Sequence, residues 1–102
     1  MSMLTKVAFF TARPRLGNTL GQRLLALVEP TRQEPSCVCY NVYQAGSSAE
    51  HWLVYEDWLS PGDFDGHMHT PYVQAFMNDL DALCSEPPEI RTFERHSEAI
   101  AC

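Results

Sequence analysis

The residues best suited to chemistry lie between positions 51 and 80 of the chain. This stretch holds both tryptophans, three of the four histidines and Glu56, a carboxylate inside an apolar run with Val54 and Trp58. His67 is a candidate general base or hydrogen-bond donor, because an imidazole changes charge near neutral pH. Glu56 is a candidate base or a residue that orients His67, because burial raises the proton affinity of a carboxylate.

These residues also have structural interpretations. His67 stands near a predicted helix junction, where it could cap a helix or bond to backbone groups. Glu56 could be a structural acceptor that ties its strand to His67 or to a helix start, since a buried carboxylate needs partners. Aromatic side chains could wall a flat substrate or simply fill the core. The candidate wall residues are Trp58, Phe9, Tyr40, Phe76 and Tyr72.

No metal site is predicted. His67 and His69 are two residues apart, which on a helix turns their side chains about 200° from each other. The four cysteines, Cys37, Cys39, Cys84 and Cys102, lack the spacing of zinc ligands. We interpret them as buried free thiols, with Cys37 and Cys39 on one face of a strand.

Four strands must position these side chains. Residues 3–12 carry apolar side chains on both parities, which predicts a strand covered on both faces. Residues 37–44 alternate in polarity, and residues 51–58 follow after a short turn-rich link, which favours an antiparallel hairpin. Residues 89–94 form the last predicted strand.

The segments between the predicted strands have the spacing of helices. Leucines three or four apart predict a helix over residues 16–33, capped near Gly17-Asn18-Thr19 and kinked by Pro30. Ser60-Pro61 and Thr70-Pro71 each combine a cap residue with a proline at the first helical position, predicting helices over residues 61–69 and 71–84. The order β-α-β-β-α-β is that of a ferredoxin-like α+β fold, an antiparallel sheet with both helical segments on one face.

Size and charge limit the alternatives. The 102 residues suit a single domain over positions 1–102, with a core at about 3–95 and a frayed tail at 96–102. Because this fold has no helices left for its second sheet face, we expect a homodimer that packs sheet to sheet.

The net charge of −6 argues against nonspecific nucleic-acid binding and docking on anionic membranes. The chain has no apolar run long enough for a membrane span and no signal-peptide pattern, so we expect a cytoplasmic protein.

Three motifs resemble those of one family. Residues 32–37, followed by Tyr40, resemble an R-x-E-P-G-C-x-x-Y element. Residues 55–58 resemble a Y-E-x-W strand, and residues 67–72, followed by Phe76, resemble an H-x-x-T-P-H-F…F junction. Together they resemble the antibiotic biosynthesis monooxygenase family of the dimeric α+β barrel superfamily, over about residues 4–94. The chain departs from the pattern at Ser36, at Tyr72 and in the additional His69.

The resemblance implies a monooxygenase that needs no cofactor and oxidises quinols, anthrones or related polyphenols with O2. Such chemistry requires a base, a dry aromatic pocket and donors for the substrate anion. Two alternatives stay open: an isomerase or decyclase that uses the same base without oxygen, and a ligand-binding module without catalysis.

Overall fold

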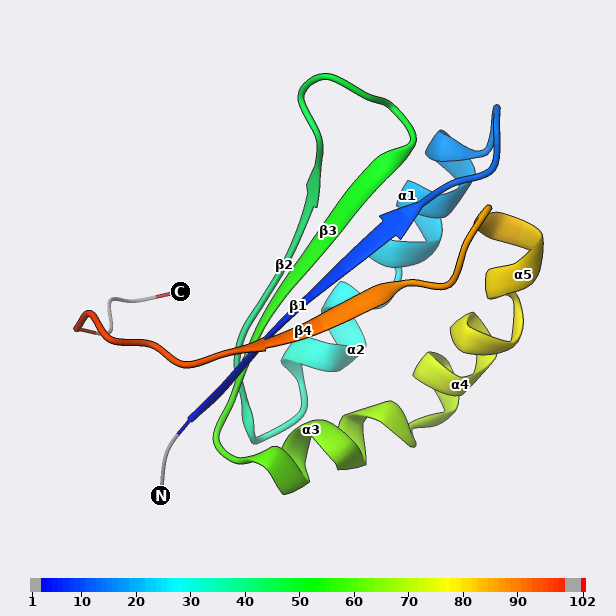
Figure 1. Cartoon of the computed structure of the whole chain (residues 1–102). Coiled ribbons are helices and arrows are strands. Elements are labelled where there is room, and N and C mark those ends of the chain that lie inside the picture. Colours follow the sequence, from blue (N-terminus) through cyan, green and yellow to red (C-terminus); the bar gives the residue numbers. More distant parts are fainter. Residues whose placement is uncertain (1–2, 99–101) are drawn as a thin grey trace.

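The computed structural model describes residues 3–98 and Cys102. Four antiparallel strands form one sheet in the order β2-β3-β1-β4, and the helices lie on one of its faces (Figure 1). The elements are β1 (Leu4–Thr11), α1 (Gly17–Leu25), α2 (Val28–Arg32), β2 (Cys37–Gln44), β3 (His51–Trp58), α3 (Pro61–Met68), α4 (Pro71–Asn78), α5 (Leu80–Leu83) and β4 (Glu89–Phe93). The predicted ferredoxin-like α+β fold is thereby confirmed.

The apolar side chains of β1 point to both faces of the sheet. Ala8, Phe10 and Ala12 face the helices and are buried, whereas Phe9 on the other face is 37% exposed. Alternation along the strand explains the difference, because neighbouring residues point to opposite faces. This second face, called the open face below, is partly covered within one chain, since Val7 on it is buried whereas Phe9 is exposed. Its predicted cover by another copy stays a prediction.

The predicted helix over residues 16–33 is two helices, because Pro30 has no N–H to donate to the carbonyl of Ala26. The capping prediction was wrong: Leu16 is the N-cap of α1 and no side chain caps it. Gly17 instead permits a close approach, since a Cβ at this position would lie 2.2 Å from the carbonyl oxygen of Ala49. The first helical segment is thus fixed against the β2–β3 link.

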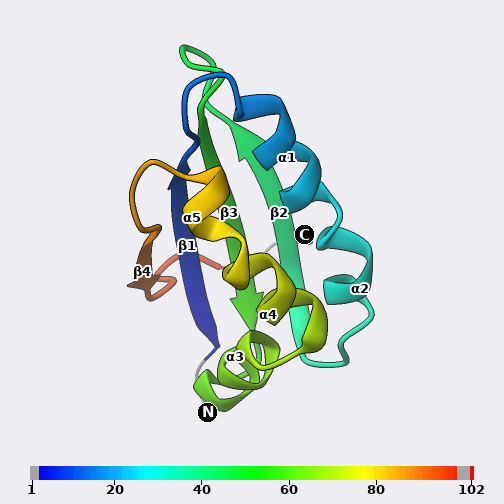
Figure 2. The same cartoon turned by 90° about the vertical axis from the view of Figure 1, so that its right-hand side faces the viewer.

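The predicted helix over residues 71–84 is also divided, at Asp79. The N–H of Asp79 donates to the carbonyl of Phe76, three residues back, so the helix tightens there. The carboxylate of Asp79 pairs with Arg23 of α1 at 2.9 Å. Figure 2 shows α1 and α2 lying over β2, with α4 and α5 beside them over the middle of the sheet.

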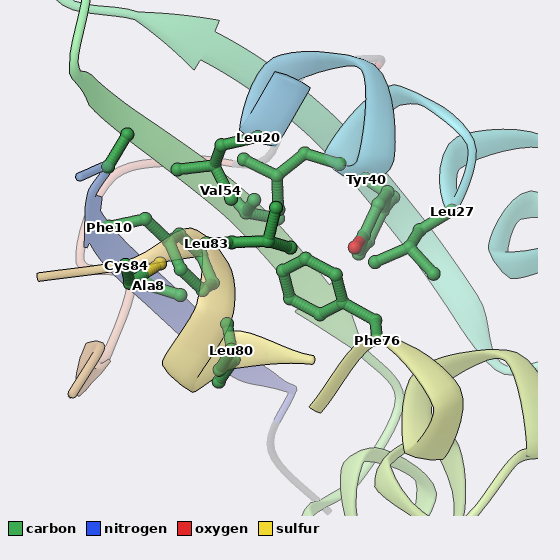
Figure 3. Packing of buried hydrophobic residues seen from close by; sticks show 12 residues of the cluster. Ala8, Phe10, Leu20, Leu27, Tyr40, Val54, Phe76, Leu80, Leu83 and Cys84 are labelled. Atoms are coloured by element: carbon green, nitrogen blue, oxygen red, sulfur yellow. The ribbon is translucent and has the colours of Figure 1, made fainter. Parts of the chain in front are cut away.

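The core fills the space between the sheet and these helices. Figure 3 shows Phe76 of α4 among side chains of the sheet and of α1 and α5. Its ring meets the ring of Phe10 edge-on, with 5.8 Å between centroids. Trp52 packs on α1 at Gly21, where a Cβ would lie 2.3 Å from the indole. The core thereby fixes α1 and α4 relative to the sheet.

A bulge in β2 corrects the prediction that Cys37 and Cys39 share a face. The register shifts between these two residues, so that Cys37 packs against the core and Cys39 lies on the open face. There Cys39 forms a disulfide with Cys102, with 5.4 Å between Cα atoms. The prediction of four free thiols was therefore wrong for this pair, whereas Cys37 and Cys84 are free.

The segment after β4 contacts the same open face. Arg95 pairs with Asp57 of β3 at 2.8 Å and contacts the hydroxyl of Tyr55 at 3.4 Å. The predicted frayed tail covers residues 96–102, of which 99–101 lie outside the described residues. Within the described part of the chain, no helix is long and apolar enough to cross a membrane.

Candidate functional site

His67 is placed by both ends of helix α3. Ser60 caps the start by accepting a hydrogen bond from the N–H of Asp63 at 3.3 Å, as its sequence pattern predicts. At the other end the hydroxyl of Thr70 donates to the carbonyl of His67 at 2.8 Å. These contacts fix both ends of α3, and His67 in its last turn is only 3% exposed.

The imidazole of His67 has a carboxylate on each side. Its Nδ1 lies 2.8 Å from Oε2 of Glu34, and its Nε2 lies 3.8 Å from Oε1 of Glu56. The first distance is that of a hydrogen bond, and the second is longer than one. Glu34 stands in the link between α2 and β2, where its N–H donates to the carbonyl of Thr31 and its carbonyl accepts from Cys37.

Glu56 is buried on the helix-facing side of β3. Its Oε1 accepts a hydrogen bond from the indole N–H of Trp58 at 2.9 Å. Burial raises the pKa of Glu56 from 4.5 to about 7; the Trp58 hydrogen bond opposes this rise, and the negative charge of Glu34 adds to it. Both protonation states of Glu56 are therefore populated near neutral pH.

Two tyrosines complete the polar surroundings. The hydroxyl of Tyr72 donates a hydrogen bond to Oε2 of Glu34. Burial, followed by this hydrogen bond, raises the pKa of Tyr72 to about 12. Tyr40 presents its ring to the edge of His67, with 5.8 Å between centroids, and burial also raises its pKa. Both hydroxyls thus keep their protons at neutral pH.

A small cavity between the sheet and the helices reaches His67 and Glu56. It measures about 30 Å³, which admits water but not an aromatic ring. Met68 and Met77 line it, and their flexible side chains can rearrange at low cost. Its walls also include Ala8, Phe10, Leu24, Leu27, Tyr40, Val54, Phe64, Val73, Phe76, Pro88 and Ile90.

Most of the site residues predicted from sequence come together here. Tyr40 and Phe76 line the cavity, and the ring of Trp58 lies 4.6 Å from the His67 ring between centroids. Tyr72 approaches from α4 through Glu34. Phe9 does not belong to this group, because alternation along β1 places it on the open face beside Tyr43 and Leu53.

Glu34 is the residue that the sequence prediction missed. It lies in an irregular link, where no hydrophobic period indicates the direction of a side chain. The only signal is its place in the R-x-E-P motif.

Among residues 3–98 and Cys102, no three His, Cys, Asp or Glu side chains are grouped to hold a metal ion. The site is therefore an arrangement of carboxylates, imidazole and phenols.

Comparisons with known proteins identify the family of the chain. Residues 3–79 match the family model described as antibiotic biosynthesis monooxygenase. The protein sll1783 of Synechocystis sp. is 31% identical over 67 residues, which are 66% of this chain and 46% of that protein. The chain thus spans less than half the length of this relative, whereas a match to Rv0793 of Mycobacterium tuberculosis, 26% identical, covers 98% of both chains.

Solved structures share the fold. The crystal structure of PA3566 from Pseudomonas aeruginosa has a TM-score of 0.89 at 27% identity, covering 95% of this chain and 97% of that one. The structure of Rv0793 has a TM-score of 0.89 at 24% identity, covering 97% and 100%. Together with the family match over residues 3–79, these findings show that the chain belongs to the antibiotic biosynthesis monooxygenase family.

Proposed function

We propose that the protein is a monooxygenase that oxidises quinols, anthrones or related polyphenols with O2 and without a cofactor. The observation that carries the proposal is that His67 and Glu56 line one cavity with aliphatic and aromatic walls, with Nε2 of His67 3.8 Å from Oε1 of Glu56. Family membership supports the reaction class. The substrate class is what the family resemblance implies, and the aromatic rings of Tyr40, Phe64 and Phe76 among the cavity walls suit a flat ring.

His67 acts as the base in this proposal. It removes a proton from the phenol or enol of the substrate, and the resulting anion is electron-rich enough to reduce O2 directly. For an anthrone, the ring CH2 group and O2 yield a ring carbonyl and water. One oxygen atom stays on carbon, the other leaves with the two protons, and O2 accepts the four electrons that the carbon loses.

Glu56 supplies the donor for the substrate anion. Because burial raises its pKa to about 7, a large share of Glu56 is protonated at neutral pH and can donate a hydrogen bond to a developing oxyanion. Trp58, Tyr40 and Phe76 keep this region apolar and strengthen such a bond by excluding water. Substrate entry requires Met68 and Met77 to move aside, because the cavity is smaller than a ring.

Oxygen uptake tests the proposal. A panel of hydroquinones and anthrones is incubated with metal-free protein, and oxygen consumption is compared for the wild type, His67→Ala and His69→Ala. His69 is the matched control because it lies two residues away and is exposed. We expect uptake above the spontaneous rate that is lost in His67→Ala and kept in His69→Ala. Equal rates for wild type and His67→Ala would contradict the proposed base.

An isomerase or decyclase is the second candidate. Its specific support is the same pair of proton-transfer groups, which can protonate one position of an enol while deprotonating another without any oxidant. Conversion of an enol substrate at an unchanged rate under anaerobic conditions would favour this reaction over the monooxygenase.

We also propose that the protein is a homodimer joined through its open sheet faces. The apolar part of this face includes Phe9, Tyr43 and Leu53. Light scattering should give twice the mass of one chain for the wild type and the single mass for Phe9→Asp. Leu25→Asp is the control, because Leu25 is an exposed apolar residue of α1; dissociation by both changes would argue against this interface.

A further inference from the structure

The two ring nitrogens of His67 have different surroundings. Nδ1 is within hydrogen-bond distance of Glu34 at 2.8 Å. Among the residues that the structure describes, Nε2 has no hydrogen-bond partner, and it lies 3.8 Å from Oε1 of Glu56. The ring is also held on its faces and edges, by Trp58 at 4.6 Å and Tyr40 at 5.8 Å between centroids. A flip of the ring that swaps the positions of Nδ1 and Nε2 would therefore break these contacts.

Glu34 limits which nitrogen carries the proton. Its Oε2 already accepts a hydrogen bond from Tyr72, and a carboxylate has no proton to give in return. The raised pKa of Tyr72 keeps that hydroxyl a donor. The contact at 2.8 Å is then favourable only when Nδ1 carries hydrogen and donates to Glu34.

We infer that Glu34, supported by Tyr72, is the positioning residue that holds neutral His67 with its proton on Nδ1 and leaves Nε2 as the basic atom in the cavity. Glu56 is thereby excluded as the orienting group and is left free to face the substrate. A carboxylate behind an imidazole also stabilises the imidazolium that forms when Nε2 takes a proton. The tautomer part of this inference is independent of the reaction, whereas the assignment of Nε2 as base rests on the proposed function.

The direct test is nitrogen NMR of the full chain labelled with ¹⁵N in histidine. At a pH at which the His67 ring is neutral, its signals should show a pyrrole-type Nδ1 and a pyridine-type Nε2. In Glu34→Ala we expect the ratio of the two tautomers to change by about tenfold toward Nε2–H, because a hydrogen bond to a charged partner is lost. Tyr72→Phe should give a smaller change in the same direction, and Glu56→Gln should give no change in that direction.

The wild-type spectrum alone can overturn the inference, so it does not depend on whether a variant folds. A pyridine-type Nδ1 in the wild type, or an unchanged tautomer ratio in folded Glu34→Ala, would refute it. Failure of every substrate to consume oxygen would remove the proposed function and leave the tautomer result unaffected.

Where activity is found, Glu34→Gln adds a second readout. We expect kcat to fall by about tenfold or more with little change in KM, and the pH profile to shift, because substrate contacts remain while the base is misaligned. Equal losses at all pH values, together with a raised KM, would indicate a merely structural role. The titratable groups around His67 that contribute to this profile are Glu34, Cys37, Tyr40, Glu56, Tyr72 and, through Glu56, Lys6.

Discussion

The indole N–H of Trp58 donates a hydrogen bond to Oε1 of Glu56, 2.9 Å away and two residues earlier on β3. Residues two apart on a strand point to the same face, so the strand itself supplies the partner that this buried carboxyl requires. An indole can only donate, and it therefore favours the ionised form of Glu56. Burial is the stronger effect, and the pKa of Glu56 still rises to about 7.

This raised pKa makes stability depend on pH in a defined direction. Between pH 4.5 and about 7 the folded state holds the Glu56 proton more tightly than the unfolded state. The contribution of the bound Glu56 proton to the free energy of unfolding is therefore fully present below pH 4.5. It is lost as the pH rises through about 7, and the total loss is about 3 kcal/mol. Glu56→Gln should be more stable than the wild type at about pH 8, by up to that amount, and should lose this advantage near pH 4.5.

Urea unfolding of both proteins at the two pH values, at one protein concentration, measures this difference. Comparison with the variant cancels the titration of other groups. A free-energy difference that is the same at both pH values would show that Glu56 does not titrate in this window.

The contact between Gly21 and Trp52 reverses the usual effect of a helical glycine. At an open helical site, Gly→Ala stabilises by about 1 kcal/mol. At Gly21 the new Cβ would lie 2.3 Å from the Trp52 ring, so we expect Gly21→Ala to destabilise by about 1–3 kcal/mol. Gly66→Ala in α3 is the control and should stabilise, because no described atom beyond its chain neighbours and the backbone of its own helix lies within 4 Å of its Cβ position. Denaturant midpoints of the two variants check the opposite signs; a stabilising Gly21→Ala would contradict this close contact.

Leu24 and Leu25 allow a matched test of the core. They are neighbours in α1, where Leu24 is fully buried and Leu25 is 55% exposed. Leu24→Ala should destabilise by about 2–5 kcal/mol, because it removes buried methyl groups and leaves a cavity. Leu25→Ala should change stability by less than about 0.5 kcal/mol. Both substitutions replace a leucine of α1 by alanine, so helix propensity changes equally in the two variants. Similar losses of stability in thermal or urea unfolding would therefore mean that another side of α1 faces the sheet.

Counting thiols tests the Cys39–Cys102 disulfide. Burial raises the pKa of the Cys37 thiol to about 11 and also raises that of Cys84, so both should react slowly with alkylating reagents in the folded protein. Without reductant we expect two labelled cysteines after denaturation, Cys37 and Cys84, and four when reductant is added first. Labelling of Cys102 in denaturant without reductant would exclude the bond.

The sequence predicted those site residues whose positions follow from local periodicity. Glu56 and Trp58 share a face by alternation, and His67 follows from the Ser60 cap and the Thr70-Pro71 junction. Phe9 could not be assigned in this way, because β1 carries large apolar residues on both parities. Only the sheet order and the side chosen by the helices show that Phe10 faces the core.

Glu34 and Cys39 required the folded chain. Glu34 lies in a link without regular structure, and it meets His67 across 33 residues of sequence. Cys39 changes face because of the bulge beside it, and a bulge adds one residue without a strong signal in the amino-acid pattern. In both cases the decisive contact is distant in sequence, where local propensity carries no information.

The disulfide also changes how the chain responds to force. It closes a loop that spans 63 residues, from Cys39 to Cys102, and encloses β3, α3, α4, α5 and β4. A force applied to the oxidised protein between a point before Cys39 and Cys102 itself can extend only the part before Cys39. About 210–230 Å of contour length stays hidden, at roughly 3.3–3.6 Å per residue, and is released in a single-molecule trace when the bond is reduced. The disulfide thus protects the part of the chain that carries Glu56 and His67 from being extended by force.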